Sequence, residues 1–283
     1  MNARTILALS TLPAQQSRAL IRIICGEATP YERTRKNLKS KFKGALNRVL
    51  NFAKHETMRK LHRYMYNTRP LKGAADSKHP GATVVGFDLN QLQQDLQSMF
   101  HIELPTMLTT SADDTLESLG YRDPWTMPAQ QVLDYIASRQ NLLSGISDDV
   151  FTEIQKQLTE GLNAGESLDQ LSQRISDTFD QIDSGRADVI ADNETAAAYS
   201  FASNAAAQAA GIQYKKWLHG ATSKVPRPYH VAIDGLVVPF DEPFPGSGDP
   251  ELMYPHDDNG SPEDIINCSC ISIPATEEEF NSQ

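Results

Sequence analysis

The chain has 283 residues, 40 % of them hydrophobic, and a formal net charge of −10. This length suffices for one large domain or for two ordinary ones with a buried core. No run of about 18 apolar residues is present, which excludes a membrane-spanning helix. The three cysteines, Cys25, Cys268 and Cys270, are too few for a disulfide framework. We therefore expect a protein made in a reducing cytoplasm, with no membrane partner.

The charge is distributed unevenly along the chain. Residues 1–72 contain 16 Lys and Arg against three acidic residues, whereas the remaining residues contain 10 basic and 33 acidic ones. Regions of opposite sign point to different environments or partners. The sequence therefore predicts a basic helical N-terminal region, residues 1–70. Prolines and glycines without periodicity then predict a linker, residues 71–87.

Two helices are predicted in the N-terminal region. A short one spans about 13–25, and a long one runs to about Asn67. The long helix opens with a capping box at Thr29-Pro30-Tyr31-Glu32, and apolar residues recur along it at helical spacing. Basic residues that could bind DNA or a portal surface cover much of the rest of this helix: Lys36, Lys39, Lys41, Lys43, Arg48, Arg59, Lys60 and Arg63.

Residues 88–183 are predicted to form a second helical region. A capping box of Asp88 and Gln91 begins a helix that ends near Phe100. A loop anchored by Trp125 follows from Pro105 to Pro128. Further helices are expected at about 128–140, at 148–162 and, behind a capping box of Ser167 with Gln170, at 168–182.

Residues 184–274 are predicted to form a third region. An alanine-rich helix starts at Ser184 and ends at the C-cap Gly211. After it, turn residues alternate with short strands at about 213–219, 229–233, 236–238 and 270–273, with Asp234-Gly235 as a tight turn close to a hairpin. Residues 275–283 are expected to be an acidic, disordered tail. The fold class is α+β, a mainly α-helical body with a small C-terminal mixed β-sheet and long loops.

A series of short motifs in the third region carries a family resemblance. The series consists of Arg186, Glu194-Thr195, Tyr199, Lys215-Lys216-Trp217, Arg227-Pro228-Tyr229-His230, Asp234-Gly235, Pro239, Tyr254-Pro255 and Ile266-Asn267-Cys268-Ser269-Cys270. In this order and spacing it resembles the Mu F-like phage head morphogenesis family, over about the last third of the chain. The sequence departs from the family at Asp192-Asn193, where Arg-Thr is usual, and at His256, near a usual Gly.

The resemblance implies a minor head protein of a tailed bacteriophage. Family members are low-copy components of the virion that associate with the portal vertex and influence capsid assembly, DNA packaging or DNA ejection. The implied partners are the portal protein, other head proteins and packaged DNA. The implied location is the head interior or the portal vertex, after synthesis in the host cytoplasm.

The motif residues also have a structural interpretation. Turn and packing roles explain most of their residue types, with Trp217 as the centre of a small core. His230, Cys268 and Cys270 differ, because a histidine and a Cys-x-Cys pair are soft ligands suited to zinc. A small loop-rich region gains stability from such a metal. A fourth ligand would come from His219, His256 or Asp257, and the alternative is two buried cysteines beside a hydrogen-bonded histidine.

Two other functions compete with that of a head protein. A metal-dependent enzyme would use Glu194, His230 and Asp234 as acid–base groups, but no phosphate loop, His-Glu-x-x-His motif or nucleophile elbow is present. We therefore expect no catalytic activity. A nucleic-acid-binding protein would act through the basic N-terminal helix, because its charge attracts phosphates.

Overall fold

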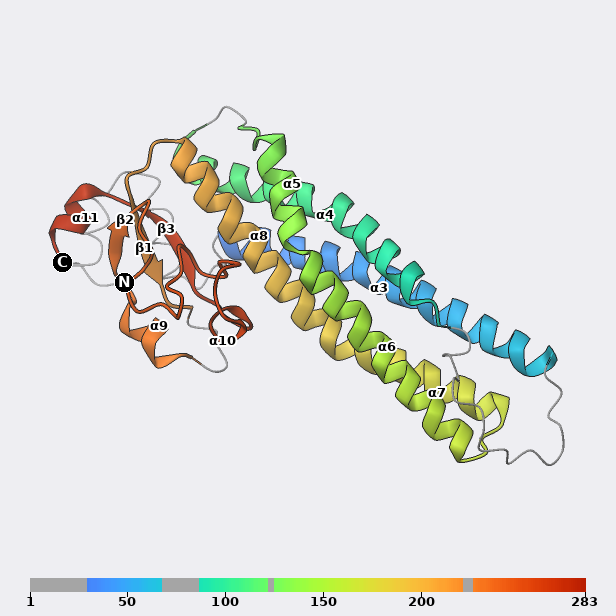
Figure 1. Ribbon diagram of the computed structural model, residues 1–283. Helices are drawn as coiled ribbons and strands as arrows, with labels where there is room; N and C mark the ends of the chain where they lie inside the picture. Colours follow the sequence, from blue (N-terminus) through green and yellow to red (C-terminus); the bar gives the residue numbers. More distant parts are fainter. Residues whose placement is uncertain (1–29, 68–86, 122–124, 221–225) are drawn as a thin grey trace, which may run out of the picture. The chain divides into compact units, whose positions relative to one another are not determined.

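In a computed structural model, residues 30–67, 87–121, 125–220 and 226–283 are described. Helices make up most of these residues, and a small sheet lies near the C-terminus, which confirms the predicted α+β class (Figure 1). The helix expected at 13–25, the cap residue Thr29 and almost all of the expected linker lie outside the described residues.

The helical elements largely follow the predicted periodicity. The long helix and the one behind Ser167 are confirmed, and at Ser167 both halves of the capping box are present. The helix behind Asp88 is confirmed at its start, because the Asp88 carboxylate accepts the Gln91 N–H at 3.1 Å. The bounds are α3 Pro30–Asn67, α4 Leu89–Ser118, α5 Ala129–Ser138, α6 Gln140–Asn163 and α7 Leu168–Gln181.

The loop expected from Pro105 is wrong, because α4 continues through this proline to Ser118. Proline inside a helix removes a hydrogen bond and costs about 3 kcal/mol. Leu104 and Leu108, which lie on one helical face, are both fully buried. Burying side chains of this size contributes roughly 1.5–3 kcal/mol each, so the apolar face outweighs the local penalty.

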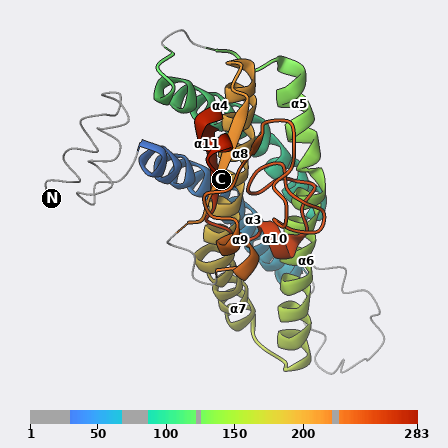
Figure 2. The same ribbon diagram turned by 90° about the vertical axis from the view of Figure 1, so that its left-hand side faces the viewer.

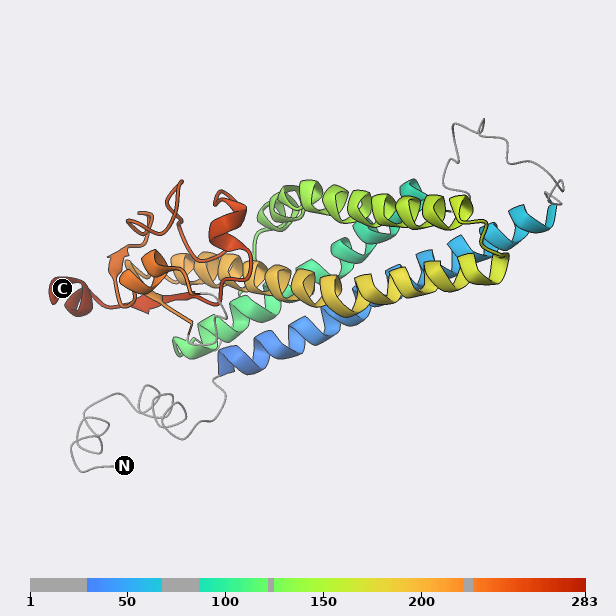
Figure 3. The ribbon, with the colours of Figure 1, turned by 90° about the horizontal axis from the view of Figure 1, so that it is seen from below.

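Helix α6 begins eight residues earlier than expected and forms an antiparallel hairpin with α7 (Figures 1 and 3). The early start is explained by Leu143 and Ile146, which are buried and extend the apolar face. Gly161 allows the two helices to approach closely, because a Cβ there would lie 2.5 Å from a methyl group of Leu171.

A π-helical turn, η1 Ile182–Arg186, connects α7 to the alanine-rich helix α8 Ala187–Ala209. The predicted alanine-rich helix is thus confirmed. Gly211 ends it as expected, with a φ of +78° that favours glycine. The Ile212 N–H donates to the Ala207 carbonyl, which completes the C-terminal cap.

The sheet contains three antiparallel strands in the order β2-β1-β3. Their bounds are β1 Tyr214–Leu218, β2 Val237–Pro239 and β3 Ile271–Ala275. In the central strand, Lys215 and Trp217 are buried, whereas the residues that alternate with them are half-buried. Trp217 lies at the centre of an apolar cluster with Val238, Phe244 and Leu252.

Two predictions for the loop region are wrong. Residues 228–232 form a short helix, α9 Pro228–Ala232, in place of a strand, because Pro228 suits the first helical position and Tyr229 and Val231 are exposed. The turn at Asp234-Gly235 therefore follows a helix and is not a hairpin between two strands.

The C-terminal residues are ordered, which corrects the expected disordered tail. A capping box at Thr276 begins α11 Glu277–Asn281. The Phe280 ring stacks on Tyr214 with centroids 4.7 Å apart, and the Gln283 side chain bonds both backbone groups of Val237. These contacts fix the tail against the sheet. The remaining short helix is α10 Pro262–Ile265.

The chain forms two compact units that are discontinuous in sequence. Of the described residues, the first unit contains 30–40, 105–121, 125–132, 192–220 and 226–283, and the second contains 41–67, 87–104 and 133–191. The first unit includes the sheet and its apolar cluster. The second is helical, with Phe42 and Phe100 in edge-to-face contact in its core. None of the helices in the described ranges is both long enough and apolar enough to span a membrane.

Candidate functional site

His230, Cys268 and Cys270 converge in the first unit, as the sequence predicted. His230 belongs to α9, and the two cysteines directly precede β3. The imidazole Nδ1 lies 3.6 Å from the Cys268 Sγ and 3.7 Å from the Cys270 Sγ. The potential ligand atoms all lie within 4.8 Å of one another, and each residue is at most 4 % exposed. The cysteines form no disulfide.

The orientation of the His230 ring is fixed from its other side. Its Nε2 lies 2.8 Å from the backbone carbonyl oxygen of Ser247, and a carbonyl can only accept, so Nε2 carries the proton. Ser247 is fully buried, and its hydroxyl donates to the Phe244 carbonyl and accepts the Leu252 N–H. Trp217 packs edge-on against the same ring. Nδ1 therefore presents a lone pair to both sulfurs.

The two thiols titrate differently because they interact. The hydrogen bond between the two thiols lowers the pKa of Cys270, and the nearby His230 ring lowers it further, although burial acts in the opposite direction. The same bond and burial raise the pKa of Cys268. The Cys270 N–H lies 3.4 Å from the Cys268 Sγ, which gives that sulfur a backbone donor. The site thus favours a sulfur anion, the form that binds soft metal ions.

None of the three expected fourth ligands joins the cluster among the described residues. Asp257 instead organises a turn, accepting the N–H groups of Met253 and Asn259. His256, with a φ of +65°, is buried in the same turn. His219 donates its backbone N–H to Asp234. The expectation that one of them completes the site is therefore wrong.

Most family-motif residues hold the C-terminal fold together. Arg227, which directly precedes α9, donates at 2.6 Å to the carbonyl of Glu263 in α10 and at 2.7 Å to that of Ile266 directly after α10. These bonds link the start of α9 to the end of α10, and the two helices are labelled in Figure 2. Gly235 has a φ of +84° and donates to the Trp217 carbonyl at 2.9 Å. Asn267 has a φ of +57°, which Asn tolerates better than most residues.

The positions that depart from the family also make structural contacts. The Asn193 side chain accepts the Asn267 N–H at 2.8 Å, although Asn193 replaces a usual Thr. Asp192 pairs with Arg35 at 3.0 Å. The neighbouring motif residues Glu194 and Thr195 are buried in α8. Arg186 lies in the second unit, 3.5 Å from Asp149, so the structure does not gather all motif residues at one place.

Five of the eight candidate DNA- or portal-binding residues of α3 form ion pairs within their own unit. Lys39 pairs with Asp192, Lys43 with Asp188, Arg48 with Glu103, Arg59 with Glu56 and Lys60 with Asp88. Lys36, Lys41 and Arg63 form no ion pair with the described residues and are exposed. Five acidic residues, four of them from the acidic part of the chain, thus neutralise much of the basic helix.

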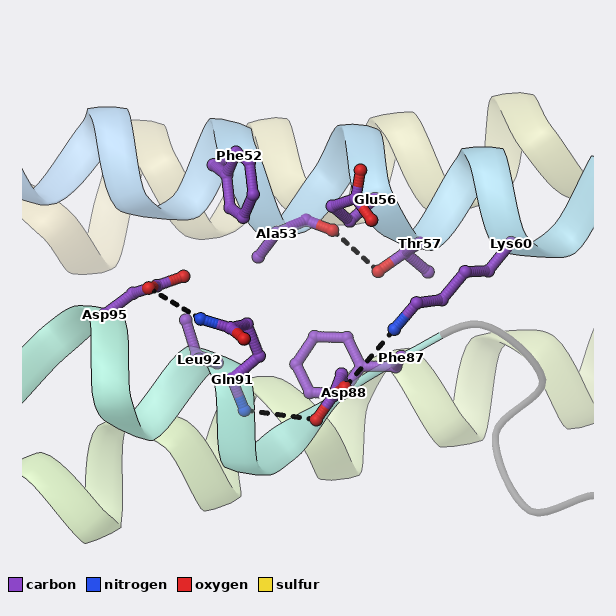
Figure 4. Close-up of a pocket in the computed structure, with 10 residues that line it drawn as sticks. All are labelled: Phe52, Ala53, Glu56, Thr57, Lys60, Phe87, Asp88, Gln91, Leu92 and Asp95. Carbon is purple, nitrogen blue, oxygen red and sulfur yellow. Dashed lines mark hydrogen bonds and ion pairs between the residues drawn. The ribbon is translucent and has the colours of Figure 1, made fainter.

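A cavity of about 200 Å³ lies between α3 and the start of α4 in the second unit (Figure 4). Lys60 reaches Asp88 across it at 3.3 Å, and the Gln91 side chain donates to Asp95 at 2.9 Å. The Thr57 hydroxyl donates to the Ala53 carbonyl. These polar side chains therefore form contacts within and between the two helices and support their packing.

Comparison with known proteins agrees with the resemblance. Residues 152–273 match the family described as Phage Mu protein F like protein. This range holds the motif series and the His–Cys–Cys cluster, and it relates this part of the chain to phage head proteins. The chain is also similar to the uncharacterized protein YqbB of Bacillus subtilis (strain 168), with 26 % identity over 199 residues. That match covers 69 % of this chain and 65 % of YqbB. No solved structure matches the chain.

Sequence reasoning gave no role to two residues of this region, Ser247 and Lys215. Ser247, which fixes the His230 ring, lies in a Gly- and Pro-rich loop that gives no local signal. Lys215 is fully buried, donates to the Met253 carbonyl at 2.7 Å and lies over the rings of Phe240 and Phe244. The alternation of β1 would have placed Lys215 on the same face as Trp217.

Proposed function

We propose that this chain is a minor structural protein of a tailed bacteriophage head. It is made in the host cytoplasm, joins the head at the portal vertex, and acts in head assembly, DNA packaging or DNA ejection. The observation that carries the proposal is the family match over residues 152–273, which coincides with the motif series. The long helices that make up most of the described residues offer surfaces for contacts with other proteins, as a structural protein requires.

We propose further that the chain is not an enzyme. The former acid–base candidates have structural partners: Asp234 accepts the His219 N–H, and His230 is held between Ser247 and the cysteines. Reactive cysteines lie in partly exposed, electropositive sites, whereas Cys268 and Cys270 are 4 % and 3 % exposed. These features favour a site that stabilises the fold over one that meets a substrate.

The proposed partners are the portal protein, other head proteins and packaged DNA, and the contact proposed is with the basic helix α3. The lysines suited to an external partner are Lys36 and Lys41, which are exposed and form no ion pair with the described residues. Lys39 and Lys43 make a matched control, because Asp192 and Asp188 already neutralise them.

Replacing Lys36 and Lys41 by Ser should weaken association more than replacing Lys39 and Lys43. If the partner is DNA, the loss of two phosphate contacts lowers the slope of log affinity against log salt by about 2. A protein partner would give a weaker salt dependence, set by screening over about 8–10 Å. Equal effects of the two double substitutions would contradict a specific contact at Lys36 and Lys41.

The proposed function is tested by disrupting the gene in the phage or prophage that encodes it. DNA-filled heads are purified from the intact strain and analysed by quantitative mass spectrometry. We expect this chain at low copy relative to the major capsid protein, and a loss of infectious particles after disruption. Its absence from purified heads at every stage of assembly would refute the proposal. Binding to DNA by a chain that never enters particles would favour the nucleic-acid-binding alternative.

A further inference from the structure

We propose that His230, Cys268 and Cys270 bind one Zn²⁺ ion, which joins α9 to the segment that enters β3. This proposal is independent of the role in a phage head. It begins with the convergence of three soft ligand atoms from two distant parts of the chain. Zinc in proteins is bound by such Cys and His ligands.

The distances among the ligand atoms agree with a tetrahedral ion. With Zn–N bonds of about 2.0–2.1 Å and Zn–S bonds of about 2.3 Å, a nitrogen and a sulfur on one ion lie about 3.5–3.6 Å apart. The Nδ1 of His230 lies 3.6 Å from the Sγ of Cys268 and 3.7 Å from that of Cys270. A single lone pair on Nδ1 can accept one thiol proton. Two sulfurs at nearly equal distance from it are better explained by a shared ion.

The groups around the ligands also suit a metal. Ligating histidines donate their second ring N–H to a carbonyl or carboxylate, which fixes the ring. His230 does so to the buried Ser247 carbonyl. Bound thiolates accept backbone N–H groups, and the Cys270 N–H lies close to the Cys268 sulfur. Among the described residues no further His, Cys, Asp or Glu joins the cluster, so the proposal commits to these three protein ligands.

The part of the chain between β1 and β3 explains why a metal would be needed. Its described regular structure consists of α9, α10 and the three-residue strand β2, of five, four and three residues. Short elements joined by long loops bury little apolar surface, and small regions of this kind use metals or disulfides for stability. An ion at this cluster would anchor α9 directly to β3.

The first measurement is the zinc content of the full chain, purified without chelators from cells grown with added zinc. We expect about one equivalent per chain. Cys268→Ser and Cys270→Ser should reduce it to near zero, and His230→Gln should reduce it strongly. The matched control is His219→Gln, which makes the same chemical change as His230→Gln at a described histidine outside the cluster and should keep the zinc.

A second measurement uses the wild-type chain, so that it does not depend on the folding of a variant. After zinc is removed and Co²⁺ is added, a thiolate-to-cobalt charge-transfer band and intense visible bands of a four-coordinate ion should appear. Chelation should also lower the melting temperature recorded by the fluorescence of the two tryptophans. Wild-type protein with reduced thiols, trace zinc and no such band would overturn the proposal. A Cys268–Cys270 disulfide in freshly purified protein would overturn it as well, because it removes both thiolates.

Discussion

Lys215 offers a quantitative test of the fold around the sheet. Its ammonium group is fully buried near the rings of Phe240 and Phe244 and donates a hydrogen bond to the Met253 carbonyl. Burial lowers its pKa from 10.5 to about 8, although the carboxylates of Asp257, Asp241 and Glu242 raise it. A difference of one in pKa corresponds to about 1.4 kcal/mol, so keeping the charge in the fold costs up to about 3 kcal/mol.

The sign of the pH dependence follows from this lowered pKa. Between pH 8 and pH 10.5 the unfolded chain binds a proton at Lys215 that the folded chain has released. The stability of the wild-type protein therefore rises with pH across this window. Below about pH 8 the full cost of the buried charge is present, and above about pH 10.5 it has disappeared.

The comparison is between the wild-type protein and Lys215→Met, which keeps a long side chain without the charge. Urea unfolding is followed by Trp217 fluorescence in a Trp125→Phe background, at several pH values from 7 to 11. The stability of Lys215→Met relative to wild type should fall by about 2–3 kcal/mol as pH rises, because other titrations cancel in the difference. A difference that does not change with pH would refute the interpretation of Lys215 as a buried cation.

Four further substitutions test packing and hydrogen bonding. Gly220→Ala should destabilise the first unit by several kcal/mol in urea unfolding, because its Cβ would lie 2.1 Å from the Ser269 carbonyl oxygen. Gly145→Ala lies at an open helical position, so in the same assay it should stabilise the second unit by about 0.5–1 kcal/mol. Phe42→Ala should cost about 3–5 kcal/mol and reduce the cooperativity of helix melting by circular dichroism. Tyr199→Phe should cost about 1–3 kcal/mol, because the Tyr199 hydroxyl donates to Asp114 at 2.5 Å, and unchanged urea midpoints would contradict this role.

Local sequence signals correctly predicted the structural features that depend only on residues close by in the chain. The capping box at Ser167 and the glycine that ends α8 both act within one turn of a helix, so the sequence was sufficient. The continuation of α4 through Pro105 was not predicted, because it depends on burial of Leu104 and Leu108 against distant segments. Apolar alternation at residues 229–233 suggested a strand, but the helical start at Pro228 prevailed.

The sequence indicated which residue types could form the candidate metal centre, and the tertiary structure brings them together. The sequence indicated His230 and the Cys-x-Cys pair because they are soft ligands. Which atoms meet, and that Ser247 fixes the ring, depends on loops that return from far along the chain. The same holds for the basic helix, where pairing of Lys39 and Lys43 with acids more than 140 residues away could not be read from the charge pattern.

Incorporation into a phage head can be tested by a cryo-electron microscopy map of the intact particle around its portal vertex. Density into which α6, α7 and the three-stranded sheet can be fitted should be present at the portal vertex and should be lost in particles from a strain with the disrupted gene. Identical portal-vertex density with and without the gene, at a resolution that separates helices, would refute the proposed role at the vertex.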